Sequence, residues 1–245
     1  MNDASSPRTL RERLPLAPKR EQDFRWRGTE VSRVEGLTDG VFAFAVTLLV
    51  VALEVPRTFN GLLDVMRGLP AFVICFAILM MFWSAHFRYH RRYGLEDWFS
   101  RLVTMAILVL VLFFVYPLKY LFTLVTVQMF GLEMTNAPII DAPGQVQQLY
   151  LIYGLGFAGV WGLYALLYVH ALRKRGELGL TANELVQTRA SLAENVIYVV
   201  VCALSITLAY TTSVGGLPGF IYMLLGPAQA FNGWWFGRKV RAPAG

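Results

Sequence analysis

The sequence has little charge and almost no cysteine for its length. Only 16% of its 245 residues are Asp, Glu, Lys or Arg, whereas soluble globular domains carry about 25%. We therefore expect no soluble domain. The two cysteines, Cys75 and Cys202, both lie within apolar runs, so the sequence indicates no disulfide framework.

Apolar residues are abundant instead, and they come in long runs. The chain is 56% hydrophobic, with a mean hydropathy of +0.50. A helix that crosses a bilayer needs about 20 consecutive, mostly apolar residues. The sequence therefore predicts an all-α, polytopic membrane protein. The six predicted transmembrane helices are residues 36–54, 69–87, 102–123, 147–171, 192–212 and 216–236.

The sixth predicted span is the least regular. Gly226-Pro227 interrupts it, and Gln229 and Asn232 lie inside it. Such a span is tolerated where neighbouring helices cover the freed backbone groups.

Shorter segments flank the spans. Residues 1–33 contain prolines and many charges but no apolar core, so we expect a mobile basic cytoplasmic tail rather than a signal peptide. Residues 34–236 form the six-helix transmembrane domain, and residues 237–245 a basic cytoplasmic tail. The longest outer loop, about residues 124–146, contains prolines and glycines but no Lys or Arg. We expect this loop to be irregular.

Nineteen of the 22 Lys and Arg residues fall on one predicted side of the membrane. Eight precede the first span, four lie between the second and third, four between the fourth and fifth, and three follow the sixth. Only Arg57, Arg67 and Lys119 fall on the other side. This is the positive-inside pattern of a six-span protein with both termini cytoplasmic. The net charge of +6 thus reports orientation, and we expect no nucleic-acid partner. The membrane is expected to be a bacterial inner or plasma membrane.

One side of the first predicted helix carries a narrow stripe of residues. Successive side chains turn by about 100°, which brings positions three, four and seven apart onto one face. Packing against another helix would give the same pattern, so spacing alone leaves its purpose open. The stripe consists of Arg33, Leu37, Gly40, Phe44 and Val51, with Thr47 and Leu48 at its flanks.

A carboxylate lies on the other side of this helix. Asp39 points about 140° away from Phe44 at helical spacing, on the face shared with Glu35 and Val46. Charged groups at such a depth are costly and usually face protein or water rather than lipid. Ordinary interfacial charges remain an alternative for Arg33 and Asp39.

These residues resemble the opening signature of the transmembrane protein 175 family of potassium channels. That signature is Arg, three residues, Phe-Ser-Asp, a small residue and an apolar helix containing Thr-Leu-Leu. Here Arg33 is followed by Leu37-Thr38-Asp39-Gly40 and then by Thr47-Leu48-Leu49, with Pro56 just beyond. Trp83-Ser84-Ala85-His86 is similar to the Trp-x-x-His of the family's second span. Leu37 and Thr38 depart from the family's Phe and Ser but keep the hydroxyl.

The resemblance implies that the first helix lines a central pore in a homotetramer. Phe44 would form the apolar constriction, where most family members have Leu or Ile, and Thr47 and Val51 would form the next layers. Gly40 and Leu48 complete the expected lining. A buried structural network would fix this helix against the second and third spans. By the same resemblance, its members are Arg33, Thr38, Asp39, Trp83 and His86.

The predicted function is a potassium-selective or weakly selective cation channel in the lipid bilayer. Monovalent cations, with K⁺ as the expected permeant ion, would pass a hydrophobic constriction, and no cofactor and no enzyme activity are expected. A secondary transporter or a proton-conducting channel stays open as an alternative. Transporters usually show inverted repeats with paired broken helices, whereas this signature occurs once. An intramembrane enzyme would have to use Asp39 and His86, which both match structural positions of the channel family.

His86 and His90 share a helical face at a spacing used by metal ligands. No acidic or cysteine partner occurs at matching positions, and Arg88, Arg91 and Arg92 add positive charge. We therefore expect no metal, with His86 in the polar network and His90 at the cytoplasmic surface.

Gly154, Ala158 and Gly162 form a ladder of small residues in the fourth span. Such ladders let membrane helices approach closely. The sequence does not decide whether this close packing lies within one subunit or between subunits.

Overall fold

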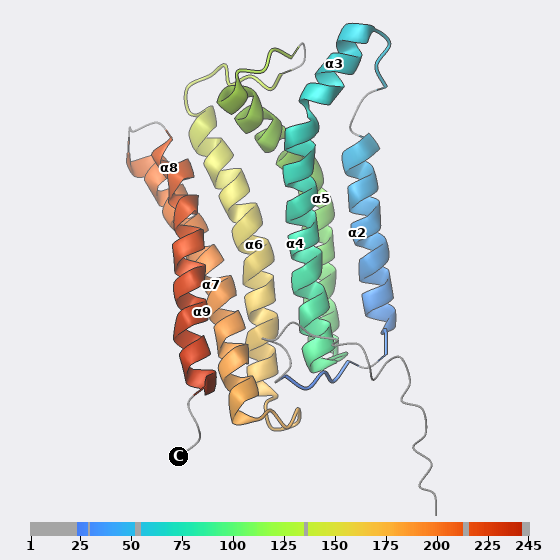
Figure 1. The fold of residues 1–245 in the computed structure, drawn as a ribbon, viewed down its shortest axis with the longest axis vertical. Helices are drawn as coiled ribbons and strands as arrows, with labels where there is room; N and C mark the ends of the chain where they lie inside the picture. The colour runs from blue at the N-terminus through green and yellow to red at the C-terminus, as the bar shows by residue number, and fades with distance from the viewer. Residues whose placement is uncertain (1–23, 29, 52–54, 135–136, 213–215, 242–245) are drawn as a thin grey trace, which may run out of the picture.

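Long helices stand side by side in the computed structural model, which describes residues 24–28, 30–51, 55–134, 137–212 and 216–241 (Figure 1). Five helices in the described part of the chain are long and apolar enough to cross a membrane. The all-α, multi-pass membrane architecture expected from the sequence is therefore confirmed. The five helices are α2 (Arg33–Val51), α4 (Leu69–Tyr93), α5 (Trp98–Phe130), α6 (Gln145–Arg173) and α7 (Ala182–Thr211).

The last segment is broken, but the predicted position of the break was wrong. It consists of α8 (Leu217–Phe220), a 3₁₀ turn (Ile221–Leu224) and α9 (Leu225–Arg241). The irregular turn thus precedes Gly226-Pro227. Pro227 lies in the first turn of α9, where a backbone N–H has no partner within the helix and proline is tolerated.

Helix ends also differ from the expected boundaries. α2 begins at Arg33 and ends at Val51, and residues 52–54 of the first predicted span lie outside the described residues. α9 extends to Arg241, so it includes the first five residues assigned to the C-terminal tail, whereas residues 242–245 are not described. At the other terminus, residues 24–28 are described and pack on the bundle, while residues 1–23 of the expected tail are not described.

Glycine ends two of the long helices. Gly94 after α4 and Gly131 after α5 both have a left-handed backbone, with φ of 58° and 59°. This conformation suits a helix C-terminus and is most easily adopted by glycine. Because α5 continues to Phe130, the irregular outer loop is shorter than expected. The described loop residues are 131–134 and 137–144.

A short helix, α3 (Phe59–Arg67), lies between α2 and α4 and was missed in the sequence. The Thr58 hydroxyl caps it by accepting the Gly61 backbone N–H at 3.1 Å. In Figure 1 this helix lies above the upper end of α4. Its apolar residues recur at helical spacing, as at Phe59, Leu62 and Met66, so the sequence did contain a signal for this amphipathic helix.

Small residues of α6 let its neighbours approach within the same chain. A side chain at Gly154 would lie 2.6 Å from Ile206 of α7, and one at Gly159 would lie 2.9 Å from Leu110 of α5. A side chain at Gly156 would collide with the ring of Phe114. Of the ladder residues, Gly154 is thus packed closely within one subunit, whereas the nearest atom to a side chain at Gly162 would be 4.0 Å away. Gly156 and Gly159, which are closely packed, lie outside the ladder.

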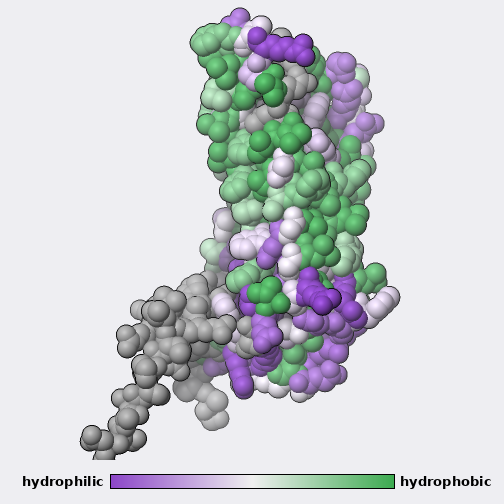
Figure 2. Space-filling model, turned by 90° about the vertical axis from the view of Figure 1, so that its right-hand side faces the viewer, coloured by the Kyte–Doolittle hydropathy of each residue, from purple (hydrophilic) through white to green (hydrophobic). Residues whose placement is uncertain are grey.

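The outside of the bundle is apolar around its middle. Figure 2 shows a broad band of apolar side chains between two more polar ends, on the side that carries α2. Phe44 on α2, Val73 on α4 and Phe113 on α5 are among the exposed apolar side chains. Such a band fits a bilayer core about 30 Å thick.

Candidate functional site

One face of α2 holds the helix in the bundle. This face packs on α4 and α5. Its apolar members are fully covered, since Phe42 is 1% exposed and Ala45 and Leu49 are 0% exposed. The complete buried set is Glu35, Thr38, Phe42, Ala45 and Leu49.

The stripe predicted from the sequence lies on the opposite, uncovered face. Phe44 is 55% exposed and Val51 66% exposed, and a side chain placed on Gly40 would meet no atom within 4 Å. Leu37 and Arg33 are also exposed, and Leu48 is half-buried at the edge. In a single chain this apolar, glycine-containing face is therefore free for a pathway or for other copies.

Thr47 also lies on the exposed face. Its hydroxyl donates a hydrogen bond to the Ala43 carbonyl at 3.0 Å. The hydroxyl oxygen keeps acceptor capacity, and this capacity is available on the uncovered side of α2.

Asp39 is joined to α4. The Trp83 indole N–H donates to Asp39 Oδ1 at 2.7 Å, and the Trp83 ring stacks on Phe87 with centroids 5.6 Å apart. Although Asp39 is exposed in the single chain, its carboxylate has a directed partner on α4. The structure thus brings two of the predicted network residues together.

A second polar contact links α2, α4 and α5. Thr38 Oγ1 lies 3.5 Å from His86 Nε2, and Thr104 Oγ1 lies 3.5 Å from His90 Nε2. The two imidazole rings are 4.2 Å apart, and both are almost fully buried. The expectation that His90 lies at the surface was wrong, because α4 continues to Tyr93 and α5 covers this part of it.

Arg33 takes no part in this network among the described residues. Its side chain is exposed. Instead, Arg91 Nε of α4 lies 3.6 Å from Glu35 Oε1. Glu35 also caps its own helix, because Glu35 Oε2 accepts the Ser32 N–H at 3.0 Å and Ser32 Oγ accepts the Glu35 N–H at 3.1 Å. The Ser-x-x-Glu capping pattern was readable from the sequence, whereas the Arg91 partner was not.

Another polar junction joins the start of α5 to the end of α6. Asp97 Oδ1 accepts the Ser100 backbone N–H at 2.8 Å, and Asp97 Oδ2 lies 2.6 Å from His170 Nε2 and 3.2 Å from Lys174 Nζ. Burial by itself raises the pKa of the Asp97 carboxyl, but the hydrogen bonds outweigh burial and hold this pKa below its usual range. The junction contains none of the predicted site residues, and it fastens two helix ends together.

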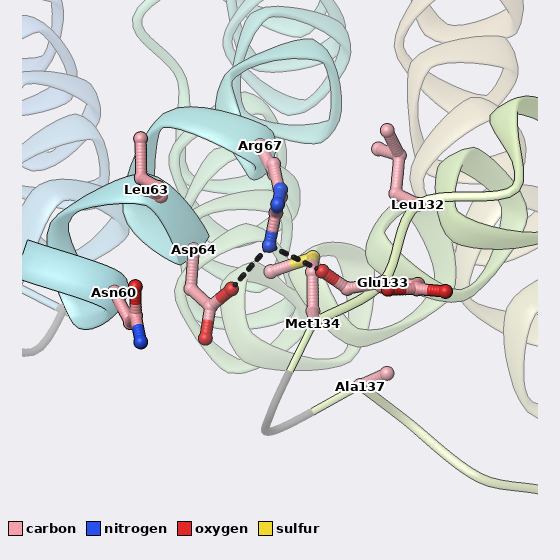
Figure 3. A pocket seen from close by; sticks show the side chains of 8 residues that line it. All are labelled: Asn60, Leu63, Asp64, Arg67, Leu132, Glu133, Met134 and Ala137. Atoms are coloured by element: carbon pink, nitrogen blue, oxygen red, sulfur yellow. Dashed lines mark hydrogen bonds and ion pairs between the residues drawn. The ribbon is translucent and has the colours of Figure 1, made fainter.

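A cleft of about 530 Å³ lies beside α3 and the outer loop (Figure 3). The Arg67 guanidinium points into it, donating to the Glu133 carbonyl at 2.7 Å and pairing with Asp64 at 3.1 Å. The cleft holds none of the predicted site residues. Its lining consists of Asn60, Leu63, Asp64, Arg67, Leu132, Glu133, Met134 and Ala137.

Comparison with known proteins identifies the family. Residues 33–117 match the family model described as the endosomal/lysosomal potassium channel TMEM175. A protein of Marivirga tractuosa named "Potassium channel" is 30% identical over 229 residues, covering 89% of this chain and 93% of that protein. The chain belongs to the TMEM175 family. Recognition of this family from the α2 signature is confirmed, and the family is one of potassium channels rather than enzymes.

Solved TMEM175 structures agree with this assignment. A threonine-to-alanine variant of the potassium channel MtTMEM175, crystallised with a nanobody–MBP fusion protein, gives a TM-score of 0.78 at 30% identity. That comparison covers 89% of this chain and 98% of the other. A homologue from Chamaesiphon minutus, described as lysosomal potassium-selective channel TMEM175 homolog, gives a TM-score of 0.52 at 21% identity over 86% of this chain and 97% of the other, which shows the fold alone.

Proposed function

We propose that this chain is the subunit of a homotetrameric potassium channel with α2 at the centre. The observation that carries the proposal is the uncovered face of α2, where Gly40, Phe44 and Thr47 lie opposite a fully buried face. One such helix cannot surround an ion, whereas closed cyclic symmetry supplies the missing walls. The named potassium channels among the relatives support the same function.

Phe44 forms the narrowest point of this pathway. Four phenyl rings around one axis leave little room for a hydrated ion, and hydrophobic constrictions gate by losing their water. The resting pore is therefore closed or conducts weakly. Thr47 lies one turn further along and offers a hydroxyl oxygen that replaces part of the hydration of K⁺. Val51 and the half-buried Leu48 line the wider section beyond.

Asp39 has a structural role in this proposal. It is held by the Trp83 indole and points away from Phe44, so it fixes α2 against α4 rather than coordinating ions. Thr38 and His86 add the buried contact beside it. Arg33 lies on the pathway side of α2, at the end where the helix begins.

Each subunit crosses the cell membrane six times, with the broken α8–α9 segment as the sixth crossing and both termini in the cytoplasm. The distribution of Lys and Arg supports this topology. Single cysteines at Ile139 and Gly176, in a chain without Cys75 and Cys202, test it. An impermeant thiol reagent added outside should label the first position and not the second, and the reverse pattern would contradict the orientation.

Ion flux into vesicles tests the function. Purified wild type and the variants Phe44→Ala and Thr47→Val are reconstituted, and K⁺ and Na⁺ fluxes are compared. Phe44→Ala should raise both fluxes and lower the preference for K⁺, because a wider neck is wetted more easily. Thr47→Val should change the preference with little effect on stability, because the side-chain shape is kept.

Phe113→Ala on α5 is the matched control, since Phe113 is also exposed, at 75%, but belongs to another helix. Its fluxes should equal those of wild type. Equal fluxes in all four proteins would refute α2 as the pathway. A coupled transporter would carry no K⁺ current without a second substrate, and a proton channel would acidify vesicles without moving K⁺.

Native mass measurement in detergent should give a tetramer, and a monomer or dimer would contradict the assembly.

A further inference from the structure

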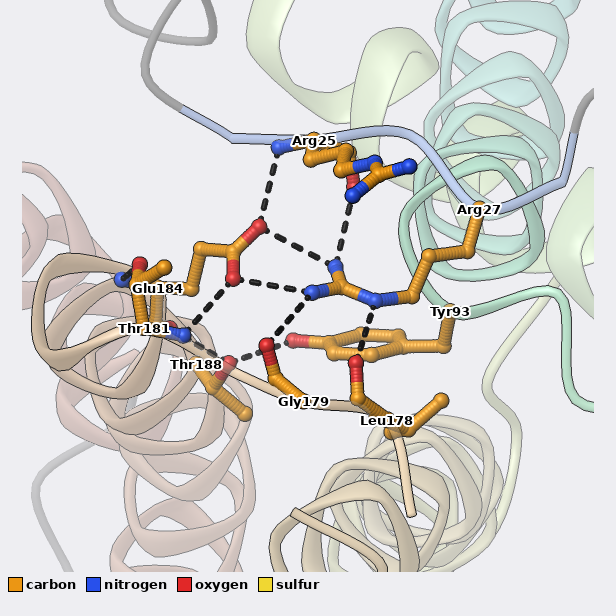
Figure 4. Close-up of polar contacts among 8 residues, drawn as sticks. All are labelled: Arg25, Arg27, Tyr93, Leu178, Gly179, Thr181, Glu184 and Thr188. Carbon is orange, nitrogen blue, oxygen red and sulfur yellow. Dashed lines mark hydrogen bonds and ion pairs between the residues drawn. The ribbon is translucent and has the colours of Figure 1, made fainter. Parts of the chain in front are cut away.

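Residues 24–28 form a strap that precedes α2 and lies across the end of the bundle where α4 ends and α7 begins (Figure 4). Phe24 is only 4% exposed and packs edge-on against Tyr93 of α4, with ring centroids 5.6 Å apart. The Arg92 guanidinium lies 5.1 Å from the Phe24 ring centroid. The strap is therefore packed into the bundle at its first described residue.

Arg27 clamps the strap to the start of α7. Its two terminal nitrogens donate to the two carboxylate oxygens of Glu184 at 3.0 and 2.9 Å. Its Nε donates to the Leu178 carbonyl at 2.8 Å, and Nη2 also reaches the Gly179 carbonyl at 3.3 Å. A bidentate salt bridge of this kind fixes the orientation of the two side chains as well as the distance between them.

Glu184 is built to receive this clamp. Its side chain is 1% exposed, and its oxygens also accept the Thr181 and Arg25 backbone N–H groups, each at 2.9 Å. The Thr181 hydroxyl in turn accepts the Glu184 N–H, which completes a capping box at the start of α7. A carboxylate buried in this way needs its cationic partner.

Backbone contacts tie the same strap to the end of α4. The N–H groups of Arg27 and Gly28 both approach the Arg91 carbonyl at 3.2 Å, and the Arg91 side chain donates to the Gly28 carbonyl at 3.1 Å. A side chain at Gly28 would lie 2.6 Å from the His90 carbonyl oxygen. The strap therefore needs glycine at this position to lie so close to α4.

The strap connects α2 to a part of the bundle beyond the helices that α2 packs on. α2 packs on α4 and α5, whereas the clamp reaches the start of α7 and the loop before it. The residues matched by the family model begin at Arg33, so this clamp lies outside the matched signature.

We propose that Arg27 and Glu184 are positioning residues of the ion pathway, holding the beginning of α2 in its resting place and so setting how often the pore opens. This inference rests on the proposed function, in which α2 lines the pore. Releasing the clamp removes the strap's attachment to α7 and leaves its contacts with α4, so the adjoining end of α2 is held less firmly and can shift, while Phe44 and Thr47 keep their chemistry. Opening should therefore become more frequent without a change in the open pore.

Single-channel recording of the full-length protein in planar bilayers separates these quantities. Arg27→Gln should raise the open probability at least threefold, with unitary K⁺ conductance and K⁺/Na⁺ preference unchanged. Arg27→Lys, which keeps the charge but loses the bidentate salt bridge, should fall between wild type and Arg27→Gln. The control is Arg25→Gln. Arg25 lies two residues before Arg27 and its side chain is exposed, so this variant loses the same charge and should behave as wild type.

An unchanged or lowered open probability in Arg27→Gln would overturn the proposal, even if fewer channels assemble, because a merely structural clamp changes channel number alone. If Arg27→Gln does not assemble, Glu184→Gln, which keeps the side-chain shape, decides in the same way. Recordings of the clamp variants that also carry Phe44→Ala distinguish failure of the clamp proposal from failure of the proposed channel function. Current that responds to Phe44→Ala but not to the clamp variants refutes the clamp alone, whereas no K⁺ current in any protein refutes the channel as well.

Discussion

Replacing Trp83 with phenylalanine removes the indole N–H that donates to Asp39 while keeping an aromatic ring on α4. The donor and acceptor are 2.7 Å apart, and a hydrogen bond to a charged group contributes about 1.5–3 kcal/mol. Because Asp39 is exposed in the single chain, water replaces part of the lost bond, and we expect the lower end, about 1.5 kcal/mol. Trp83→Phe also reduces the contact with Phe87, so the single variant alone does not isolate the bond.

A double-mutant cycle with Asp39→Asn isolates it. Asparagine keeps an acceptor oxygen but removes the charge, and a neutral hydrogen bond contributes about 1 kcal/mol, so the coupling between the two changes should be about 0.5 kcal/mol. The stabilities of wild type, the two single variants and the double variant are measured by thermal unfolding in detergent, with the remaining folded protein quantified by size-exclusion chromatography. Vesicle flux should show little change in K⁺/Na⁺ preference. Additive effects on stability would refute the bond, and a change confined to ion preference would mean that Asp39 faces the ions.

Two further predictions concern α6 and the junction at Asp97. Gly156→Ala should destabilise the protein by about 1–2 kcal/mol, since overpacking against Phe114 exceeds the gain in helix propensity. Gly162→Ala, with its nearest neighbour 4.0 Å away, should be neutral or stabilising by up to about 1 kcal/mol; equal melting temperatures would contradict the close packing of Gly156. Asp97→Asn should cost roughly 1 kcal/mol near neutral pH. Because the folded pKa of Asp97 lies below its ordinary value, this advantage of wild type is present above about pH 5 and is lost as pH falls through the folded pKa. The difference in melting temperature between the two proteins should be constant from about pH 8 to pH 5 and should narrow towards pH 3, and a difference that stays constant down to pH 3 would contradict the assignment.

The parts of the structure that were predictable follow from local periodicity. The long helices were predictable from the apolar runs because a bilayer core imposes a minimum apolar length on each of them. The angular spacing in α2 separated the Phe44 stripe from the buried face. Contacts between distant segments were not predictable in this way. Arg27 and Glu184 are 157 positions apart, and no local sequence pattern in either segment predicts that the two residues pair. His90 was misplaced because the charges that follow it suggested a helix end, whereas α4 continues to Tyr93.

The helices differ markedly in length. At 1.5 Å per residue, the 19 residues of α2 span about 28 Å and the 33 residues of α5 about 50 Å. α2 therefore just matches the hydrocarbon layer, across which nearly all of the membrane voltage falls, while the longer helices project beyond it. In the proposed pore, Phe44 lies about 17 Å from the start of α2, near the middle of that voltage drop, where a crossing ion would feel a steep field. Arg27 precedes α2, and Glu184 lies at the start of the longer helix α7. Both charges are therefore at the edge of the field. Opening controlled by the strap should thus depend only weakly on voltage, even though the current through each open pore depends on it strongly.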